Sequence, residues 1–217
     1  MSTLLLPLLL VAGAAPPAAQ VRPAVALAAA EFRKIDRDSG KDNYYRVVSE
    51  GGESWVAADY RPGMESETFG AKLPEALRKK ATLLRWRWRV RAFPPGGDDC
   101  VPGKGDSAAG VFLTFHSGLK WIILKYIWSE TRPKGTVCDR RNGPFLRRDT
   151  TVLESGAGAG EWRAEAVDPK GEYAQHFGVK REDVPELVGV GLFTDGDQTK
   201  SGSSADYGGF QLETDVR

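Results

Sequence analysis

The sequence predicts an all-β protein, an antiparallel β-sandwich that carries one or two short helices. Short runs rich in β-branched and aromatic residues recur along the chain, and turns rich in glycine and proline separate them. One of these runs, Leu83–Val90, alternates strictly between apolar and basic residues, which indicates a strand with one dry face. Long stretches of helical periodicity are missing from the sequence, so helices contribute little to the expected fold.

The first half of the domain is expected to begin with a hairpin. Tyr44–Glu50 and Ser54–Tyr60 are both strand-like and flank Gly51-Gly52, a common turn pair. Pro74–Lys80 suits a helix of one or two turns, because proline is favoured at the first helical position. In Leu83–Val90, alternation places two sets of side chains on opposite faces: Trp86 and Trp88 on one, and Arg85, Arg87 and Arg89 on the other.

The second half supplies the remaining strands and one capped helix. Ser107–Phe115 and Leu119–Trp128 are expected as neighbouring strands, and the second is apolar on both faces, as in a central strand. Asp168–Gly178 is expected to be a short helix, with Asp168 as its cap, Pro169 in its first turn and Gly178 at its end. Four further runs have strand character: Arg147–Ser155, Glu161–Val167, Leu187–Thr194 and Tyr207–Thr214.

The N-terminus has the pattern of a secretory signal peptide. An apolar run, Leu4–Val11, precedes the small-residue sequence Ala12-Gly13-Ala14, although no Lys or Arg stands before the run. The run is too short to span a bilayer, which takes roughly 20 residues. We therefore expect a signal peptide over 1–19, a linker over 20–30 and one sandwich domain over 31–217, in a periplasmic or secreted protein. The alternative is an Ala/Pro-rich tail that arises from a misplaced start codon.

Charge and histidine content exclude several classes of partner. Thirty basic residues nearly balance 29 acidic ones, so overall charge gives no electrostatic reason to expect nucleic acid or an anionic membrane surface as a partner. The two histidines, His116 and His176, are too few for a multi-histidine metal centre and are expected to be ordinary surface residues.

The two cysteines are expected to form a disulfide. Cys100 and Cys138 are the only pair in the chain, and an exported protein folds in an oxidising compartment. Their Cα atoms should then lie within about 7 Å of each other. No Cys-His setting that would indicate a catalytic thiol is visible in the sequence.

The late loop Asp195–Thr199, "DGDQT", follows a hydrophobic strand and has four possible roles. It formally matches the D-x-D-x-T nucleophile motif of haloacid-dehalogenase-type phosphatases, but too little chain follows for the rest of such an enzyme. Asp195 and Asp197 offer oxygens to Ca²⁺, although the other donors of an EF-hand are missing. The Asp and Thr side chains can instead order their own turn. The fourth role is binding of a ligand by the same carboxylates.

Aromatic residues and carboxylates are the other candidate site residues. Aromatic rings can stack on the apolar faces of sugars, and Tyr126 and Trp128, near a strand end, are better placed for this than the core-like Trp86 and Trp88. Asp106 precedes a strand, and Tyr207 begins another. The expected ligand-binding set is Asp106, Tyr126, Trp128, Asp195, Asp197, Thr199 and Tyr207.

Several segments, in this order and spacing, together resemble the DUF3047 family of bacterial envelope proteins of unknown function: "LLRWRWRV", "GDSAAGVFLTF", "LKYIWSETRPKGT", "EWRAEAVDPKGEYAQHFG" and "VGVGLFTDGDQT…ADYGGF". The resemblance covers roughly residues 31–213. It implies a jelly-roll sandwich similar to galactose-binding domains and carbohydrate-binding modules. The late loop of other members reads closer to T-D-T-D-N-T, where this chain has Gly196 and Gln198. The cysteine pair is not part of the family pattern.

Three functions are compatible with these observations. The first is an exported, non-catalytic sandwich that binds a carbohydrate or another cell-envelope ligand and needs no cofactor, with Ca²⁺ as the one candidate ion. The second is a polysaccharide hydrolase that uses Asp106 with Asp195 or Asp197, because glycoside hydrolysis needs two facing carboxyl groups. The third is a structural envelope protein without a small ligand. We expect neither a nucleic-acid partner nor a membrane-spanning segment.

Overall fold

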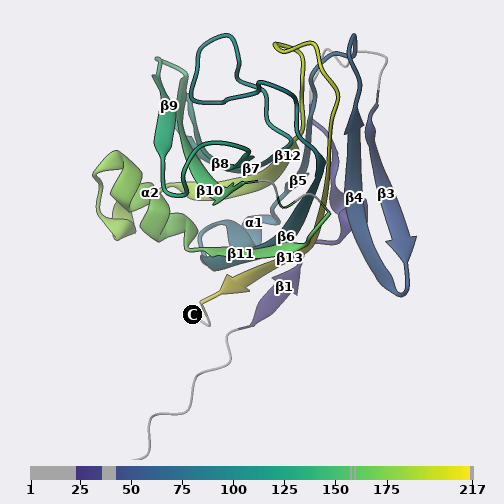
Figure 1. The fold of residues 1–217 in the computed structure, drawn as a ribbon. Helices are drawn as coiled ribbons and strands as arrows, with labels where there is room; N and C mark the ends of the chain where they lie inside the picture. The colour runs from purple at the N-terminus through teal and green to yellow at the C-terminus, as the bar shows by residue number, and fades with distance from the viewer. Residues whose placement is uncertain (1–22, 36–42, 157, 159, 216–217) are drawn as a thin grey trace, which may run out of the picture.

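Two β-sheets face each other in the computed structural model, which describes residues 23–35, 43–156, 158 and 160–215 (Figure 1). Within these residues one sheet has six strands, in the order β11-β6-β13-β4-β3 with β1 also on β13, and the other has seven, in the order β2-β5-β12-β7-β8-β10-β9. We call them the six-stranded and the seven-stranded sheet. The prediction of an all-β sandwich is confirmed.

The strands of the six-stranded sheet are β1 (Ala24–Ala26), β3 (Tyr45–Glu50), β4 (Glu53–Tyr60), β6 (Ala81–Ala92), β11 (Arg163–Val167) and β13 (Ser203–Thr214). Those of the seven-stranded sheet are β2 (Arg33–Lys34), β5 (Thr68–Lys72), β7 (Ala109–Ser117), β8 (Lys120–Ser129), β9 (Val137–Asn142), β10 (Leu146–Ser155) and β12 (Glu186–Phe193). The helices are α1 (Glu75–Arg78) and α2 (Pro169–Phe177), with 3₁₀ turns at Ala29–Glu31 and Arg181–Asp183.

One pair of strands departs from the expected antiparallel arrangement. Among the described strands, β8 and β10 pair in parallel, and every other paired neighbour is antiparallel. The chain leaves β8, forms β9 at the edge of the sheet, and returns between them as β10. Because β9 runs opposite to β8 and β10 runs opposite to β9, β10 runs in the same direction as β8.

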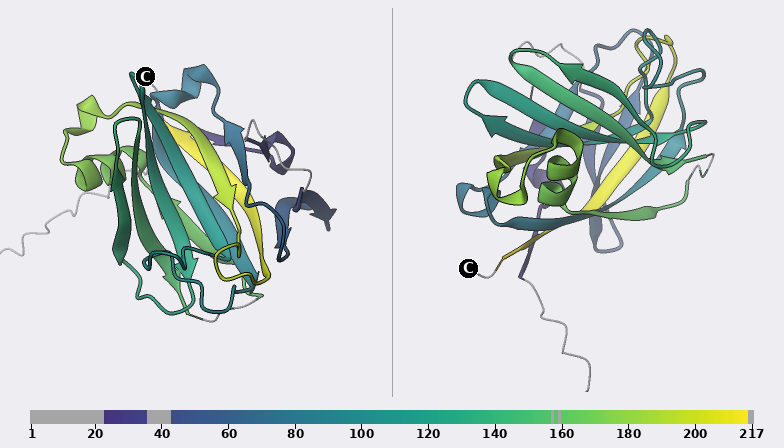
Figure 2. Two further views of the ribbon diagram at one scale, coloured as in Figure 1. Left: turned by 90° about the horizontal axis from the view of Figure 1, so that it is seen from above. Right: turned by 90° about the vertical axis from the view of Figure 1, so that its left-hand side faces the viewer.

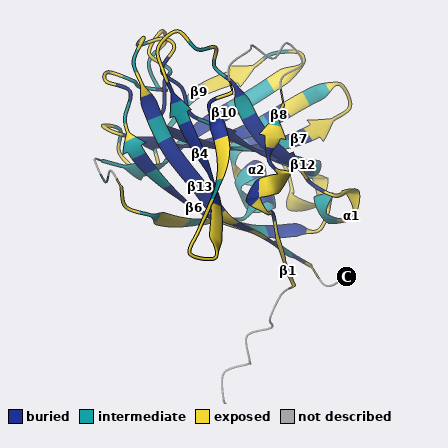
Figure 3. Cartoon of the chain, turned by 90° about the vertical axis from the view of Figure 1, so that its right-hand side faces the viewer, coloured by how far each residue is buried: buried dark blue, intermediate teal, exposed yellow. Residues whose placement is uncertain are grey.

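The inner faces of the two sheets form one core. Along many strands, buried residues that belong to this core alternate with more exposed residues of the outer face (Figure 3). In β6 the alternation predicted from the sequence is confirmed: Trp86 and Trp88 are at most 2% exposed and pack edge to face, with ring centroids 5.7 Å apart. The arginines of β6 lie on the outer face and make cross-strand ion pairs, as between Arg87 and Glu53 (2.6 Å) and between Arg89 and Asp206 (2.6 Å). They therefore stabilise strand pairing on the outer face.

Helix α2 lies across one open side of the sandwich, between the two sheets (Figure 2). Its predicted boundaries are confirmed: the Asp168 side chain accepts hydrogen bonds from two backbone N–H groups of the first turn, and Gly178 ends the helix with a left-handed φ of 66°. Tyr173 and Phe177 carry its buried face, and the Tyr173 ring meets Phe115 of β7 at 4.8 Å. The helix therefore closes the core where the sheets diverge.

Two expectations about the chain outside the strands need correction. The segment 20–30, expected as a linker, instead contains β1, which pairs with β13, and its Leu27 and Ala29 are buried in the core. The side chain of His176, expected at the surface, is only 8% exposed, and its Nδ1 lies 3.1 Å from the Asp149 carboxylate, because α2 packs it against β10.

Residues 1–19, expected as a signal peptide, lie outside the described residues. None of the helices in the described part of the chain has the length and apolar character that a bilayer crossing requires.

Candidate functional site

Two loops meet at one end of the seven-stranded sheet, and they position most of the predicted site residues. The first joins β6 to β7 over 93–108, and the second joins β12 to β13 over 194–202. Backbone and side chain both connect them: Asp195 N donates to Ser107 O (3.1 Å), and Ser107 N donates to Asp195 Oδ1 (3.0 Å). Gln198 Oε1 accepts from Gly105 N at 3.0 Å. The two loops therefore form a single wall.

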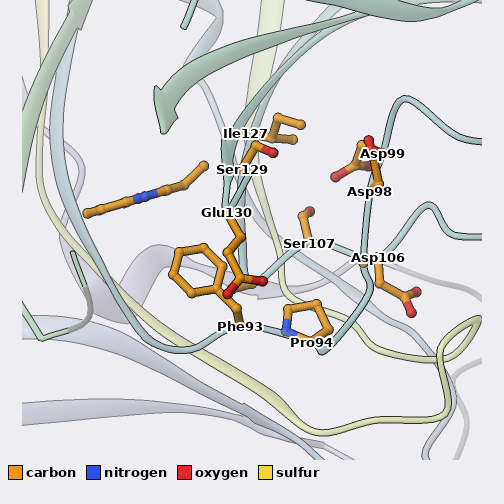
Figure 4. Close-up of a pocket in the computed structure, with 12 residues that line it drawn as sticks. Phe93, Pro94, Asp98, Asp99, Asp106, Ser107, Ile127, Ser129 and Glu130 are labelled. Carbon is orange, nitrogen blue, oxygen red and sulfur yellow. The ribbon is translucent and has the colours of Figure 1, made fainter. Parts of the chain in front are cut away.

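Asp106 holds the late loop in place. Its side chain accepts hydrogen bonds from Gln198 N (3.2 Å), Thr199 N (2.6 Å) and Thr199 Oγ1 (2.6 Å), and the residue is 2% exposed. Figure 4 shows the first loop beside a small cavity of about 10 Å³, with Asp106 pointing away from Phe93 and Pro94. The sequence placed Asp106 beside the "DGDQT" loop, and the structure assigns it a structural role there.

We expect Asp106→Ala to lower the free energy of unfolding by about 2–4 kcal/mol, because loop N–H groups lose a charged acceptor. Amide hydrogen exchange at Gln198 and Thr199 should accelerate more than exchange in the core strands. Urea unfolding and hydrogen-exchange mass spectrometry measure both effects. Asp183→Ala, at an exposed acidic residue, serves as the control and should change stability by no more than about 0.5 kcal/mol. Equal effects of the two variants would contradict the structural role of Asp106.

Gly196 closes this loop tightly. A Cβ atom at this position would lie 2.1 Å from Ser201 O, and Ser201 N donates a hydrogen bond back to Gly196 O (3.0 Å). A residue with a side chain would force the loop open. The close approach of Ser201 therefore requires glycine at this position of the loop.

Asp195 and Asp197 differ in exposure, but the pKa of each is raised. Burial raises the pKa of Asp195 to about 8, and the nearby Lys125 ammonium offsets only part of this effect. Asp197 is exposed, and its pKa is raised by partial burial and by the neighbouring Asp106 carboxylate. Asp195 is therefore protonated at neutral pH, where it can donate a hydrogen bond.

The three carboxylates also form a cluster of the kind that can bind a cation, with one oxygen from each within 4.8 Å of the others. Ca²⁺ takes six to eight oxygen ligands. Here the Asp106 side chain already accepts three loop hydrogen bonds, and the positive charge of Lys125 acts on Asp195. The cluster therefore offers fewer free oxygen donors than a calcium site takes.

Lys125 is the residue that sequence reasoning missed. It lies on the outer face of β8, is 3% exposed, and its Nζ pairs with Asp99 Oδ1 at 2.5 Å. Its ammonium group also lies 5.1 Å from the ring centroid of Phe193 and 5.5 Å from that of Phe112. The sequence did contain a signal for it, a single lysine inside the apolar run "WIILKYIW". A lysine buried in such a strand needs a specific partner, so it marks a position where a charged group is held.

These groups line a cavity of about 470 Å³ on the outer face of the seven-stranded sheet. Its lining includes acidic, basic and aromatic side chains: Asp99, Asp195, Asp197, Lys125, Arg148 and Phe193. Gln198 and Arg141 add further polar groups at the rim. We call it the outer-face pocket. It can offer hydrogen-bond donors, acceptors and one aromatic surface to a polar ligand.

The predicted disulfide forms one wall of this pocket. Cys100 and Cys138 are bridged, with their Cα atoms 5.2 Å apart, and this confirms the prediction. The bridge attaches the first loop to β9, and Cys100 itself lines the outer-face pocket. The loop is therefore held over the sheet.

Three predicted aromatic residues lie elsewhere. Tyr126 and Trp128 are each 1% exposed on the inner face of β8, so the expectation that they stack on a ligand is wrong. Side chains alternate between the two faces of β8, and these two lie on the face that meets the core. Trp128 Nε1 donates to Gly156 O at 2.9 Å. Tyr207 is fully buried, and its hydroxyl donates to Phe193 O (2.8 Å) and lies 2.7 Å from Thr194 Oγ1. It lies beneath the late loop and does not face the pocket.

Asp106 likewise does not supply a free carboxyl group for hydrolysis, because it is buried and its oxygens accept loop hydrogen bonds. Asp195, Asp197 and Gln198 line the pocket, whereas Thr199 bonds to Asp106 and to Ser201 Oγ (2.6 Å). The "DGDQT" loop is therefore held by its own Asp and Thr side chains and by Asp106, which agrees with the turn-ordering role among the four considered. The carboxyl groups of Asp195 and Asp197 also reach a cavity.

Solved structures with a similar fold include endoglucanase cel12A from Rhodothermus marinus, with a TM-score of 0.47 and 11% identity over 89% of this chain and 96% of that one. The family 11 carbohydrate-binding module of a cellulase from Clostridium thermocellum gives a TM-score of 0.46 and 7% identity over 91% and 98%. The family 11 xylanase from Neocallimastix patriciarum gives 0.42 and 13% over 90% and 100%. Similarity this low is evidence neither for a shared ligand nor for a shared reaction.

No curated protein sequence matches this chain significantly. A family model does: the one described as protein of unknown function (DUF3047) matches residues 30–211. This span contains both sheets, apart from β1 and the end of β13, and both loops of the site. The chain therefore belongs to the DUF3047 family.

Proposed function

We propose that the domain binds a carbohydrate, or another polyhydroxylated ligand of the cell envelope, in the outer-face pocket without transforming it. The observation that carries this proposal is the composition of the pocket, which combines ionised and protonated carboxyl groups, cationic donors and one aromatic ring around about 470 Å³. Ligand pockets of small molecules commonly have about 300–1,000 Å³. Hydroxyl groups both donate and accept hydrogen bonds, so such a mixed lining suits them.

The charged groups of the pocket are fixed before a ligand arrives, which favours binding. Lys125 is held by Asp99 and by two aromatic rings, and the Asp195 carboxyl group is held by Ser107 N. A preorganised site loses little conformational entropy on binding. Asp197 is the exposed carboxylate at the rim, so it is the group through which a ligand hydroxyl would first be recognised.

The disulfide supports the further proposal that the protein acts in the periplasm or outside the cell. Disulfides persist in oxidising compartments and are rare in the cytosol. Mass spectrometry of protein from the periplasmic fraction would test this, because a cleaved N-terminus is expected there. Full-length chain confined to the cytosol would contradict it.

We expect Asp197→Ala to weaken glycan binding by about tenfold to a hundredfold, because a hydrogen bond to a charged group contributes about 1.5–3 kcal/mol. A glycan array identifies ligands of the wild type, and calorimetric titration measures the affinity of the variant. Asp183→Ala is the matched control, and it removes an exposed carboxylate far from the pocket lining. Both variants should melt at the temperature of the wild type.

Three outcomes of this experiment are informative against the proposal. Equal affinity of Asp197→Ala and wild type would place the ligand elsewhere on the molecule. New reducing ends in the same mixtures would favour hydrolysis, in which protonated Asp195 would act as the acid, and Asp195→Asn should then abolish them. If no glycan or envelope extract binds, the structural role becomes the better explanation.

A further inference from the structure

Two turns at the other end of the seven-stranded sheet form an exposed apolar tip. The β7–β8 turn carries Leu119 (82% exposed) and is followed by Trp121 (47%), and the β9–β10 turn carries Phe145 (64%) and Leu146 (36%). The two turns are adjacent, because Trp121 N donates to Phe145 O (2.8 Å) and Trp121 is the register partner of Leu146. We call these four residues the apolar tip.

The loop carboxylates of the outer-face pocket lie at the opposite end of the sheet from the apolar tip, and only the side of the pocket lined by Arg141 and Arg148 approaches the tip. Strand β7 begins at the first site loop and ends at the β7–β8 turn, and its nine residues span roughly 30 Å. The four side chains are among the eight large hydrophobic residues that are exposed in the described part of the chain; the other four are Val25, Ile35, Val47 and Val179. Contiguous exposed apolar side chains indicate an interaction surface, whereas single ones do not.

Basic residues surround the tip. Lys120, Arg140 and Arg147 carry positive charge beside the two turns, whereas Arg141 and Arg148 line the outer-face pocket and Asp149 follows in β10. The net charge of the whole chain is near zero although basic residues gather at the tip. The net charge therefore does not exclude an anionic partner at the tip. Arg140 is 70% exposed and only 3.7 Å from Asp149, and Arg147 stacks on the Phe177 ring at 4.1 Å, so part of this charge is fixed to the sheet.

The partner must match both the apolar side chains and the positive charge. A second copy of the chain would bring the same basic residues face to face, which is repulsive. A neutral glycan would leave the basic residues unused, and a soluble polyanion would leave Leu119 and Phe145 exposed. An anionic lipid surface matches both, because its headgroups attract Lys and Arg and its acyl boundary accepts apolar side chains.

We propose that the apolar tip docks the sandwich onto an anionic lipid surface. Leu119 and Phe145, the two most exposed side chains, enter the acyl boundary. Trp121 lies at the headgroup level, where tryptophan is enriched in membrane proteins. Lys120 and Arg140 contact the headgroups. Asp195 and Asp197 of the outer-face pocket then lie at the end of the sheet that is distant from the lipid, and the docking uses none of the residues that line the pocket.

The test is co-sedimentation of the full chain with vesicles of phosphatidylcholine, with and without phosphatidylglycerol. We expect the wild type to bind the anionic vesicles, and Leu119→Ser combined with Phe145→Ser to weaken partitioning by at least about tenfold. Lys120→Gln combined with Arg140→Gln should remove the preference for phosphatidylglycerol. Val25→Ser combined with Val47→Ser changes two exposed apolar residues of the six-stranded sheet and should leave binding unchanged.

Depth of insertion gives a second measurement that does not depend on stability. Brominated lipids should quench tryptophan fluorescence of the wild type and quench Trp121→Phe much less. The other tryptophans are either buried, as are Trp55, Trp86, Trp88 and Trp128, or packed on the six-stranded sheet, as is Trp162 beside Trp55 and Arg87. Failure of the wild type to bind either kind of vesicle would overturn the proposal. Equal binding by the Leu119→Ser/Phe145→Ser variant, with wild-type circular dichroism, would do so as well. Binding of a soluble polyanion or an acidic protein in place of vesicles would assign the tip to that partner.

Discussion

The Asp195→Asn variant is expected to lose most of the pH dependence of folding that the wild type shows between about pH 4 and 8. Burial raises the pKa of Asp195 from 3.8 to about 8, so the folded protein binds a proton in this window that the unfolded chain has released. Stability therefore falls as the pH rises, and it levels off above the folded pKa. Asparagine resembles the protonated acid and keeps the oxygen that accepts from Ser107 N.

The effect should reach a few kcal/mol, with about 6 kcal/mol as the upper bound for a shift of this size. Urea unfolding of both proteins at about pH 4 and at about pH 8.5 measures it: the two should differ little at the lower pH, and the variant should be the more stable at the higher pH. Glu165→Gln is the comparison, because burial raises the pKa of Glu165 to about 7 and its contribution has the same sign. A wild type whose stability is constant over this range would contradict the assignment.

Removal of the Cys100–Cys138 bridge is expected to lower the free energy of unfolding by about 4 kcal/mol. The bridge closes a loop with a sequence separation of 38 residues, and the entropy that such a loop removes from the unfolded chain corresponds to this amount. Cys100→Ala combined with Cys138→Ala, studied by urea unfolding, gives the value without reducing agents.

The same double variant should also weaken ligand binding in the outer-face pocket, because Cys100 and the first loop form its wall. The ion pair between Arg132 and Asp98 (2.7 Å) and the pair between Lys125 and Asp99 keep part of the loop in place. Binding should therefore weaken without being abolished. Unchanged stability together with unchanged affinity would show that the loop is positioned by these pairs alone.

Alternation along single strands allowed the fold class to be predicted, but it could not assign both faces of β8. In "LKWIILKYIW" every position is apolar except two lysines, so Tyr126 and Trp128 could have faced either side. The structure shows why both faces are apolar: the inner one meets the core, and the first site loop covers part of the outer one, where Lys125 and Ile127 are buried. A loop that folds over a sheet leaves no periodic signal in the strand beneath it.

The site loops were predicted to lie together, but their internal roles were not. Asp195 and Asp197 follow a strand, so the sequence placed them at one end of a sheet. Asp106 precedes a strand, and the structure brings it to the same end. Which carboxylate faces the cavity depends on hydrogen bonds between residues about 90 positions apart, such as Asp106 with Thr199. Strands β5 and β9 were not predicted, because "TFGAK" and "VCDRRN" lack a long apolar face.

Strand β9 lies at the edge of the seven-stranded sheet, where unpaired backbone groups could recruit a strand from another molecule. Its sequence carries Arg140 and Arg141, both exposed, and its Cys138 is joined to the first site loop. Edge-to-edge addition of a second chain would bring these arginines together and meet the tethered loop. The disulfide and the arginines thus make this edge a barrier to amyloid-like polymerisation.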